Sequence, residues 1–186
     1  ILGSLYVSLV STALIARETE QKTLGLLLSH PVSRVSVLLG KFSAHVLSLV
    51  IFTVFSFLGF YLGTYHGIID VPYEPYRFVI VCINGLFYFL ALASLGILLS
   101  VLFNEHKKAA VASLLFFAMS YLSFFLGAFS PKWSTVKKFT IFKFFDTEKL
   151  FMTTEFQWTS VICLLIISQI LIAIAAFIFS RKEITE

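Results

Sequence analysis

The sequence predicts an all-α, polytopic membrane helical bundle, and three observations favour this fold class. Hydrophobic residues make up 59% of the 186-residue chain and charged residues only 13%, far from the usage of soluble domains. The mean hydropathy is +0.95. Four runs without Asp, Glu, Lys or Arg exceed the roughly 20 residues that cross a hydrocarbon core. Runs of this length indicate helices rather than barrel strands, because each helix satisfies its own backbone hydrogen bonds.

Five spans are expected in one transmembrane domain over 1–186, and the first of them is truncated. The expected spans are 1–16, 42–65, 78–103, 109–129 and 158–179. The first run would rise only about 24 Å as a helix, less than the roughly 30 Å core, and we interpret it as the tail of a longer span. A signal peptide is the competing interpretation, but no basic segment precedes the run and no small-residue cleavage site follows it.

The charged connections predict the orientation of the chain. Segment 17–41, the turn at 104–108 and the tail from Ser180 share one side, which holds eight basic residues against six on the other. The bias strengthens when the long external segment 130–157 is discounted, because the rule applies best to short loops. Segment 17–41 and the C-terminus are therefore expected in the cytoplasm, and the protein in the plasma membrane. Contacts of basic residues with lipid headgroups account for the net charge of +4 without a nucleic acid.

Segment 17–41 carries the strongest functional signal in the sequence. Polar residues at its start are followed by leucines at helical spacing. Pro31 ends this pattern, because the residue before a proline avoids the α region. We expect a short amphipathic helix across the membrane face. Its leucines either rest among the headgroups or dock on a partner protein.

Four sequence elements follow one another in this segment. They are an acidic residue (Glu18 or Glu20), the run TLGLLL (Thr23–Leu28), the run SHPVSR (Ser29–Arg34) and the run LLGK (Leu38–Lys41). In this order they resemble the cytoplasmic segment of ABC-2 type transporter permeases, most closely the branch with separate permease and ATPase subunits. That branch includes permeases for drug or ion export. The resemblance implies six spans with cytoplasmic ends, of which the first run of this chain would be the second.

The resemblance also implies a mechanism, which is ATP-driven alternating access by a dimer with a second permease copy or a homologous permease. A coupling helix would dock on a separate ABC ATP-binding subunit that holds ATP and Mg²⁺. The Gly40-Lys41 pair does not form a phosphate-binding loop, because Val35 replaces the required first Gly and Phe42 replaces Ser or Thr. The residues expected at the docking site are Glu18, Glu20, Lys22, Leu24, Leu27, Leu28 and Arg34. For the polar members, contact with neighbouring cytoplasmic helices is the alternative.

The spans also suggest a substrate path. Their interiors lack Asp, Glu, Lys and Arg, which argues against a proton-coupled carrier. Clustered aromatic residues would line a path for an apolar or amphipathic substrate, or would face lipid and fill the bundle. The candidate path residues are Asn84, Phe116, Phe117, Ser120 and Phe124. For the polar members, interhelical hydrogen bonding is the alternative. External segment 130–157 is expected to form interfacial helices and is a candidate outer lid.

No catalytic, cofactor or metal site is expected in this chain. The histidines lack HxxxH and HExxH spacing, and Cys82 and Cys163 lie in different expected spans. We therefore expect no enzyme activity in the chain itself. Two classes of function remain, which are the permease half of an ATP-driven exporter and a non-transporting membrane anchor. The anchor would use the same docking for mechanical or regulatory work.

Overall fold

The fold is known from a computed structural model that describes residues 2–23, 33–67, 75–129, 140–145 and 156–182. The described residues form five α-helices, one short 3₁₀ helix and no strand. In chain order they are α1 (Leu2–Glu20), α3 (Arg34–Tyr65), α4 (Pro75–Leu102), α5 (His106–Phe129), η2 (Ile141–Phe144) and α8 (Trp158–Arg181). Among the described residues, α3, α4, α5 and α8 are long and apolar enough to cross a membrane. The predicted all-α membrane bundle is confirmed.

The helices that flank segment 17–41 extend into it from both ends, beyond the expected spans. α1 continues through Glu20, and α3 begins at Arg34 rather than at residue 42. Ser33 caps α3, since its hydroxyl accepts a hydrogen bond from the Ser36 N–H at 3.1 Å. With 32 residues, α3 is about 48 Å long and exceeds the roughly 30 Å core. The expected bounds followed the apolar runs, whereas the helix continues through the charged residues beside them.

The end of α1 has its own local signature at Lys22. This residue has a φ of 55°, in the left-handed region. The Lys22 N–H donates to the Thr19 carbonyl at 3.2 Å, and the Thr23 N–H donates to the Glu18 carbonyl at 3.0 Å. These two bonds form a Schellman motif, which usually has glycine at the left-handed position. The motif fixes where α1 stops.

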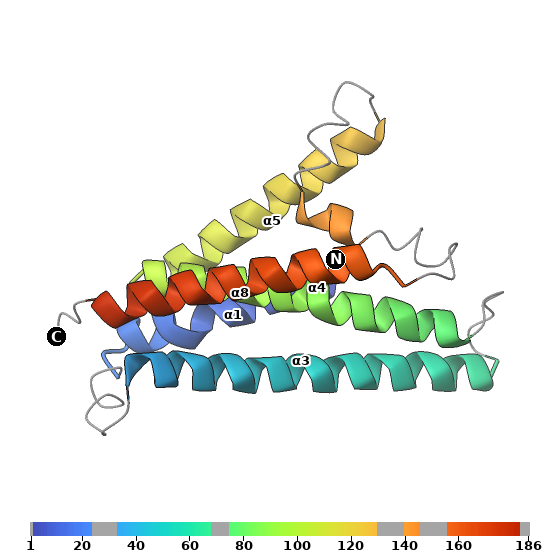
Figure 1. The fold of residues 1–186 in the computed structure, drawn as a ribbon, viewed down its shortest axis with the longest axis horizontal. Coiled ribbons are helices and arrows are strands. Elements are labelled where there is room, and N and C mark those ends of the chain that lie inside the picture. The colour runs from blue at the N-terminus through green and yellow to red at the C-terminus, as the bar shows by residue number, and fades with distance from the viewer. Residues whose placement is uncertain (1, 24–32, 68–74, 130–139, 146–155, 183–186) are drawn as a thin grey trace.

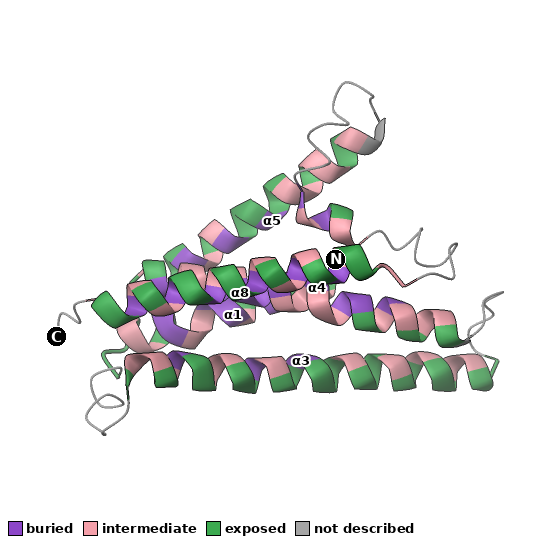
Figure 2. Ribbon diagram, viewed as in Figure 1, coloured by how far each residue is buried: buried purple, intermediate pink, exposed green. Residues whose placement is uncertain are grey.

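α4 is the central helix of the bundle. It packs along α8 and α1 and also contacts α3 and α5, whereas α1 and α3 touch each other little. Figure 1 shows α3, α4 and α8 running along one another, while α5 leaves the bundle at an angle with η2 beside it. Buried residues gather on the helices around α4, and most of the surface of α3 is exposed (Figure 2).

Small and hydroxyl-bearing residues form the contact between α1 and α4. A Cβ added at Gly96 would lie 1.9 Å from the Ser11 Oγ and 3.3 Å from the Ser8 carbonyl oxygen. The Ser100 Oγ accepts hydrogen bonds from the N–H groups of Ile15 and Ala16 at 2.9 and 2.7 Å. Close approach through small residues is a common way for membrane helices to pack.

Hydroxyl pairs connect further helices within the bundle. The Ser8 and Ser113 hydroxyls, on α1 and α5, lie 2.5 Å apart. The Ser94 and Ser168 hydroxyls, on α4 and α8, lie 2.6 Å apart. Both pairs are buried, where each hydroxyl needs a partner because lipid offers none. Hydrogen bonding between helices therefore accounts for these serines.

Candidate functional site: the polar end and the aromatic cluster

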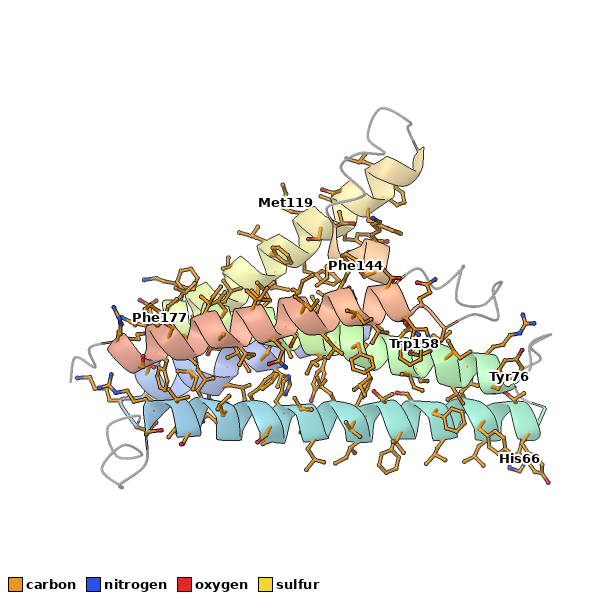
Figure 3. The ribbon with its side chains drawn as sticks, viewed as in Figure 1. His66, Tyr76, Met119, Phe144, Trp158 and Phe177 are labelled. Carbon is orange, nitrogen blue, oxygen red and sulfur yellow. The ribbon has the colours of Figure 1, made fainter. Side chains whose placement is uncertain are left out.

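The polar end of the bundle is the place where α1, α4 and α8 finish and α3 and α5 begin. It contains Glu18, Glu20, Arg34, Lys41, Val101, His106 and Lys182. Figure 3 places Phe177 near this end, and His66 and Tyr76 at the far end. The described ends of segment 17–41, which are residues 17–23 and 33–41, both lie at the polar end.

The first link of the polar end joins α1 to α3. The Lys41 ammonium group forms an ion pair with the Glu18 carboxylate. Their side chains are 24% and 25% exposed, so neither is fully hydrated. An ion pair shielded in this way is screened less by salt than one on an open surface.

The second link joins α1 to α5. The Glu20 carboxylate accepts a hydrogen bond from the backbone N–H of His106 at 3.0 Å. His106 is the first residue of α5, and the first N–H groups of a helix have no partner within it. A carboxylate at this position also complements the positive end of the helix dipole. Glu20 therefore serves as a cap supplied by another helix.

The third link joins α3, α8 and α4. The Arg34 guanidinium donates a hydrogen bond to the Lys182 carbonyl, just after the end of α8. The Lys182 ammonium group in turn donates to the Val101 carbonyl at 2.6 Å, near the end of α4. Burial lowers the pKa of Lys182 from its ordinary value, because the charged group loses hydration. The two ends of segment 17–41 are thus connected to α4, α5 and α8.

Most of the predicted docking residues fall within the described ranges. Glu18, Glu20 and Arg34 contact neighbouring helices, which is the alternative that the sequence left open. Lys22 is exposed just after α1. The leucines Leu24, Leu27 and Leu28 lie outside the described residues. Sequence reasoning missed Lys41 and Lys182 as members of this network, because a lysine at a span end reads as a headgroup anchor.

A family model described as "ABC-2 family transporter protein" matches residues 1–184. The chain belongs to this family. It is a transmembrane permease of an ABC transporter and a multi-pass membrane protein. Permeases of this family work with an ABC ATP-binding subunit. Comparison with curated proteins and with solved structures gave no match.

An aromatic cluster lies farther along the permease, between α4, α5 and η2. It consists of Tyr88, Phe117, Tyr121, Phe124 and Phe142. The Phe142 ring lies at the centre, with its centroid 5.4 to 5.9 Å from those of the other four. Such distances are typical of favourable aromatic pairs. Phe142 fills the wedge between α5 and the rest of the bundle.

The aromatic cluster lies deeper in the membrane than the sequence predicts for a part of external segment 130–157. Tyr88 is near the middle of α4 (Pro75–Leu102), and Phe117 is near the middle of α5 (His106–Phe129). Residues 140–145 of external segment 130–157 therefore reach deep between the spans rather than lying at the interface. A helix of only four residues cannot pair all of its own backbone groups, so backbone at such depth needs cover from protein or water, and the surrounding rings provide cover. The rest of that segment, apart from 156–157, lies outside the described residues.

The structure brings together some of the predicted path residues and separates others. Phe117 and Phe124 both contact Phe142, whereas Phe116 is exposed on α5 and Ser120 is half-buried. Asn84 is buried one turn before Tyr88, and its amide donates to the Ile80 carbonyl at 2.9 Å. Within the described ranges, the Asn84 Oδ1 has no partner. A polar acceptor thus lies near the aromatic cluster.

Proposed function

We propose that this permease is half of an ATP-driven exporter whose motor docks on segment 17–41. The motor is a separate ABC ATP-binding subunit that carries the ATP and Mg²⁺, so the permease itself catalyses no reaction. A second copy or a homologous permease completes the membrane part in the plasma membrane. Segment 17–41 and the C-terminus face the cytoplasm, as the distribution of basic residues favours.

The polar end is the observation that carries this proposal. Segment 17–41 enters from α1 and leaves into α3, and each of these helices is linked to others at that end. A force applied to the segment would act on α1 and α3 together. The Glu20 and Arg34 contacts would pass it on to α5 and α8. Rigid-body tilting of helices is a common way to convert local closure into a change of access.

The aromatic cluster provides the second part of the mechanism. Alternating access needs a path that is closed toward one side while it is open toward the other. Phe142 occupies the space between α4 and α5, where its ring contacts Tyr88 and Phe117. In this proposal, η2 withdraws from the cluster when the motor closes. The apolar walls favour an apolar or amphipathic substrate.

Replacing Leu27 and Leu28 together with glutamate tests the docking. We expect the ATP-binding subunit to stop co-purifying with the permease and ATP-driven transport to be lost. Docking buries apolar side chains that a carboxylate would keep hydrated. Lys107→Glu is the matched control, because it changes the net charge by the same two units at an exposed residue outside segment 17–41.

Three outcomes of these measurements decide between the alternatives. Loss of the subunit in the leucine variant, with normal yield and retention in the control, supports docking. Normal co-purification and transport in the leucine variant contradict it. A wild-type complex that hydrolyses ATP but moves no substrate into inside-out vesicles would contradict export and favour the non-transporting anchor.

A further inference from the structure

Gln169 places a polar amide in the middle of α8, the most apolar of the four candidate spans. The most apolar window of α8 has a mean hydropathy of 3.0, against 2.0 to 2.3 for the other three. Gln169 lies 11 residues after Trp158 and 12 before Arg181, the two ends of the helix. At roughly 1.5 Å per residue, each end is about 16–18 Å away. The side chain of Gln169 is too short to snorkel over that distance to the headgroups.

The Gln169 amide faces outward and has no partner in the described part of the chain. The residue is exposed, and its side chain makes no hydrogen bond with the described residues. The exposed serines Ser48 and Ser56 on α3 differ, because their hydroxyls donate to carbonyls one turn earlier in the same helix, at 3.1 and 2.8 Å. An amide has two N–H donors and a carbonyl acceptor, and hydrocarbon chains pair with none of them. Gln169 therefore needs a partner that the single chain does not supply.

Gln169 belongs to a line of outward residues along α8, which we call the α8 seam. Its members are spaced four, three, four and seven residues apart, and all of them are exposed: Ile162, Ile166, Gln169, Ala173 and Ser180. Another face of α8 is buried in the bundle, so exposed and buried residues alternate along the helix (Figure 2). Spacing by three and four residues is the pattern with which two helices pack side by side at a small crossing angle. The α8 seam is thus shaped for contact with one further helix.

The chemistry of Gln169 favours a second copy of the same chain as the source of that helix. Two facing amides satisfy each other, because the N–H of each donates to the carbonyl oxygen of the other. Two copies inserted in the same direction are related by a two-fold axis along the membrane normal, so identical residues meet at identical depth. A second copy therefore presents an amide where the first one needs it. An unrelated helix would require a polar side chain of its own at that depth.

We propose that two copies of this permease associate through the α8 seam, with the two Gln169 amides hydrogen-bonded to each other across the two-fold axis. The isoleucines of the two seams pack on one another in the half away from the polar end. Ala173 and Ser180 let the helices approach more closely toward the polar end, as small residues do between membrane helices. This inference rests on the proposed function for the presence of a second permease, and it identifies that permease as an identical chain.

Cysteine crosslinking of the full-length permease in liposomes tests the contact. Cys82 and Cys163 are first replaced with alanine. Ala173→Cys places a thiol on the α8 seam. Ile174→Cys is the matched control, because residue 174 is also exposed and lies at nearly the same depth, but is turned by about 100° around the helix. After oxidation with copper phenanthroline, we expect at least about fivefold more covalent dimer from Ala173→Cys, since the control thiols face away from each other.

Gln169→Leu tests the hydrogen bond separately from the packing. Energy transfer between two differently labelled copies, measured as the protein is diluted into lipid, gives the dissociation constant of the dimer. We expect this constant to increase about five- to thirtyfold, the range for polar pairs between model membrane helices. Gln169→Asn keeps an amide and should retain most of the affinity. Ser56→Leu is the control and should leave the constant unchanged, because its hydroxyl bonds within α3.

The outcomes separate this inference from the proposed function. Equal crosslinking of Ala173→Cys and Ile174→Cys overturns the α8 seam, even if the complex still exports, and so does an unchanged dissociation constant in Gln169→Leu. A permease that stays monomeric, or that pairs only with a different permease, also overturns it. A dimer that crosslinks at residue 173 but does not bind the ATP-binding subunit supports the α8 seam and contradicts the exporter.

Discussion

α3 and α4 are nearly equal in hydropathy but differ in burial. The most apolar windows of the two helices have mean hydropathies of 2.2 and 2.3, yet 6% of the window is buried in α3 and 44% in α4. α4 meets α1, α3, α5 and α8 along its length. In α3 the buried residues are Leu38, His45 and Leu49, all in its first half.

The difference lies in where the small residues are placed rather than in hydropathy. α3 also contains glycines, but no atom lies within 4 Å of a Cβ added at Gly40 or Gly59. α4 offers Gly96, Ser94 and Ser100 to its neighbours, and each makes a close contact or a hydrogen bond. The outward face of α3 presents large side chains such as Phe55 and Leu62, which lipid solvates as well as protein does. α3 is buried only in its first half, although the rings of Phe57 and Phe60 contact Phe78 of α4 in its second half.

The largest effect is expected where α4 meets α1. Gly96→Leu should destabilise the permease by about 3 kcal/mol, because the new side chain overlaps Ser11 in a closely packed contact. Gly59→Leu on α3 is the matched control, since no atom lies within 4 Å of a Cβ added there. Thermal unfolding in detergent measures both. Equal melting temperatures for the two variants would remove the distinction between the helices.

A smaller effect is expected at the aromatic cluster, which packs on α4. Phe142→Ala should cost about 2 kcal/mol, less than the same change in a soluble core, because lipid can solvate part of the exposed surface. Phe55→Ala on α3 should cost almost nothing, because Phe55 is already 69% exposed. Denaturation of the two variants in mixed micelles provides the comparison. If Phe55→Ala costs as much as Phe142→Ala, the outward face of α3 has a partner.

The smallest effect is expected for single hydroxyl groups. Ser94→Ala should cost about 0.6 kcal/mol, the average for hydrogen bonds between membrane helices. Ser56→Ala on α3 should be neutral, because the Ser56 hydroxyl bonds only to the carbonyl of Phe52 in its own helix. A double-mutant cycle of Ser94 with Ser168 measures the pair directly. A coupling energy of zero would mean that this contact does not hold α4 to α8.

The fold could largely be predicted from the sequence, because the lengths of the apolar runs determine how many helices can cross the membrane. Their limits were less accurate, since charged residues continue α1 and α3 beyond the hydrocarbon core. No glycine marks the end of α1, where Lys22 adopts the left-handed conformation instead. The equal hydropathy of α3 and α4 hid which of them is central.

The candidate site could be predicted only in part. The resemblance of segment 17–41 indicated Glu18, Glu20 and Arg34, but contacts between distant helices are not encoded in any local pattern. Phe117 and Phe124, two of the residues suggested for a substrate path, belong to the aromatic cluster. Phe142 was expected at the external interface, because a polar segment between two spans is normally outside the membrane.

A charge exchange between Glu18 and Lys41 tests most directly whether the polar end couples segment 17–41 to the bundle. The measurement is ATP-driven transport by the complete complex in liposomes, beside co-purification of the ATP-binding subunit. Glu18→Lys and Lys41→Glu should each keep the subunit bound but lose most of the transport, and the double variant should recover it. Wild-type transport in both single variants, or a double variant no better than either, would contradict the account.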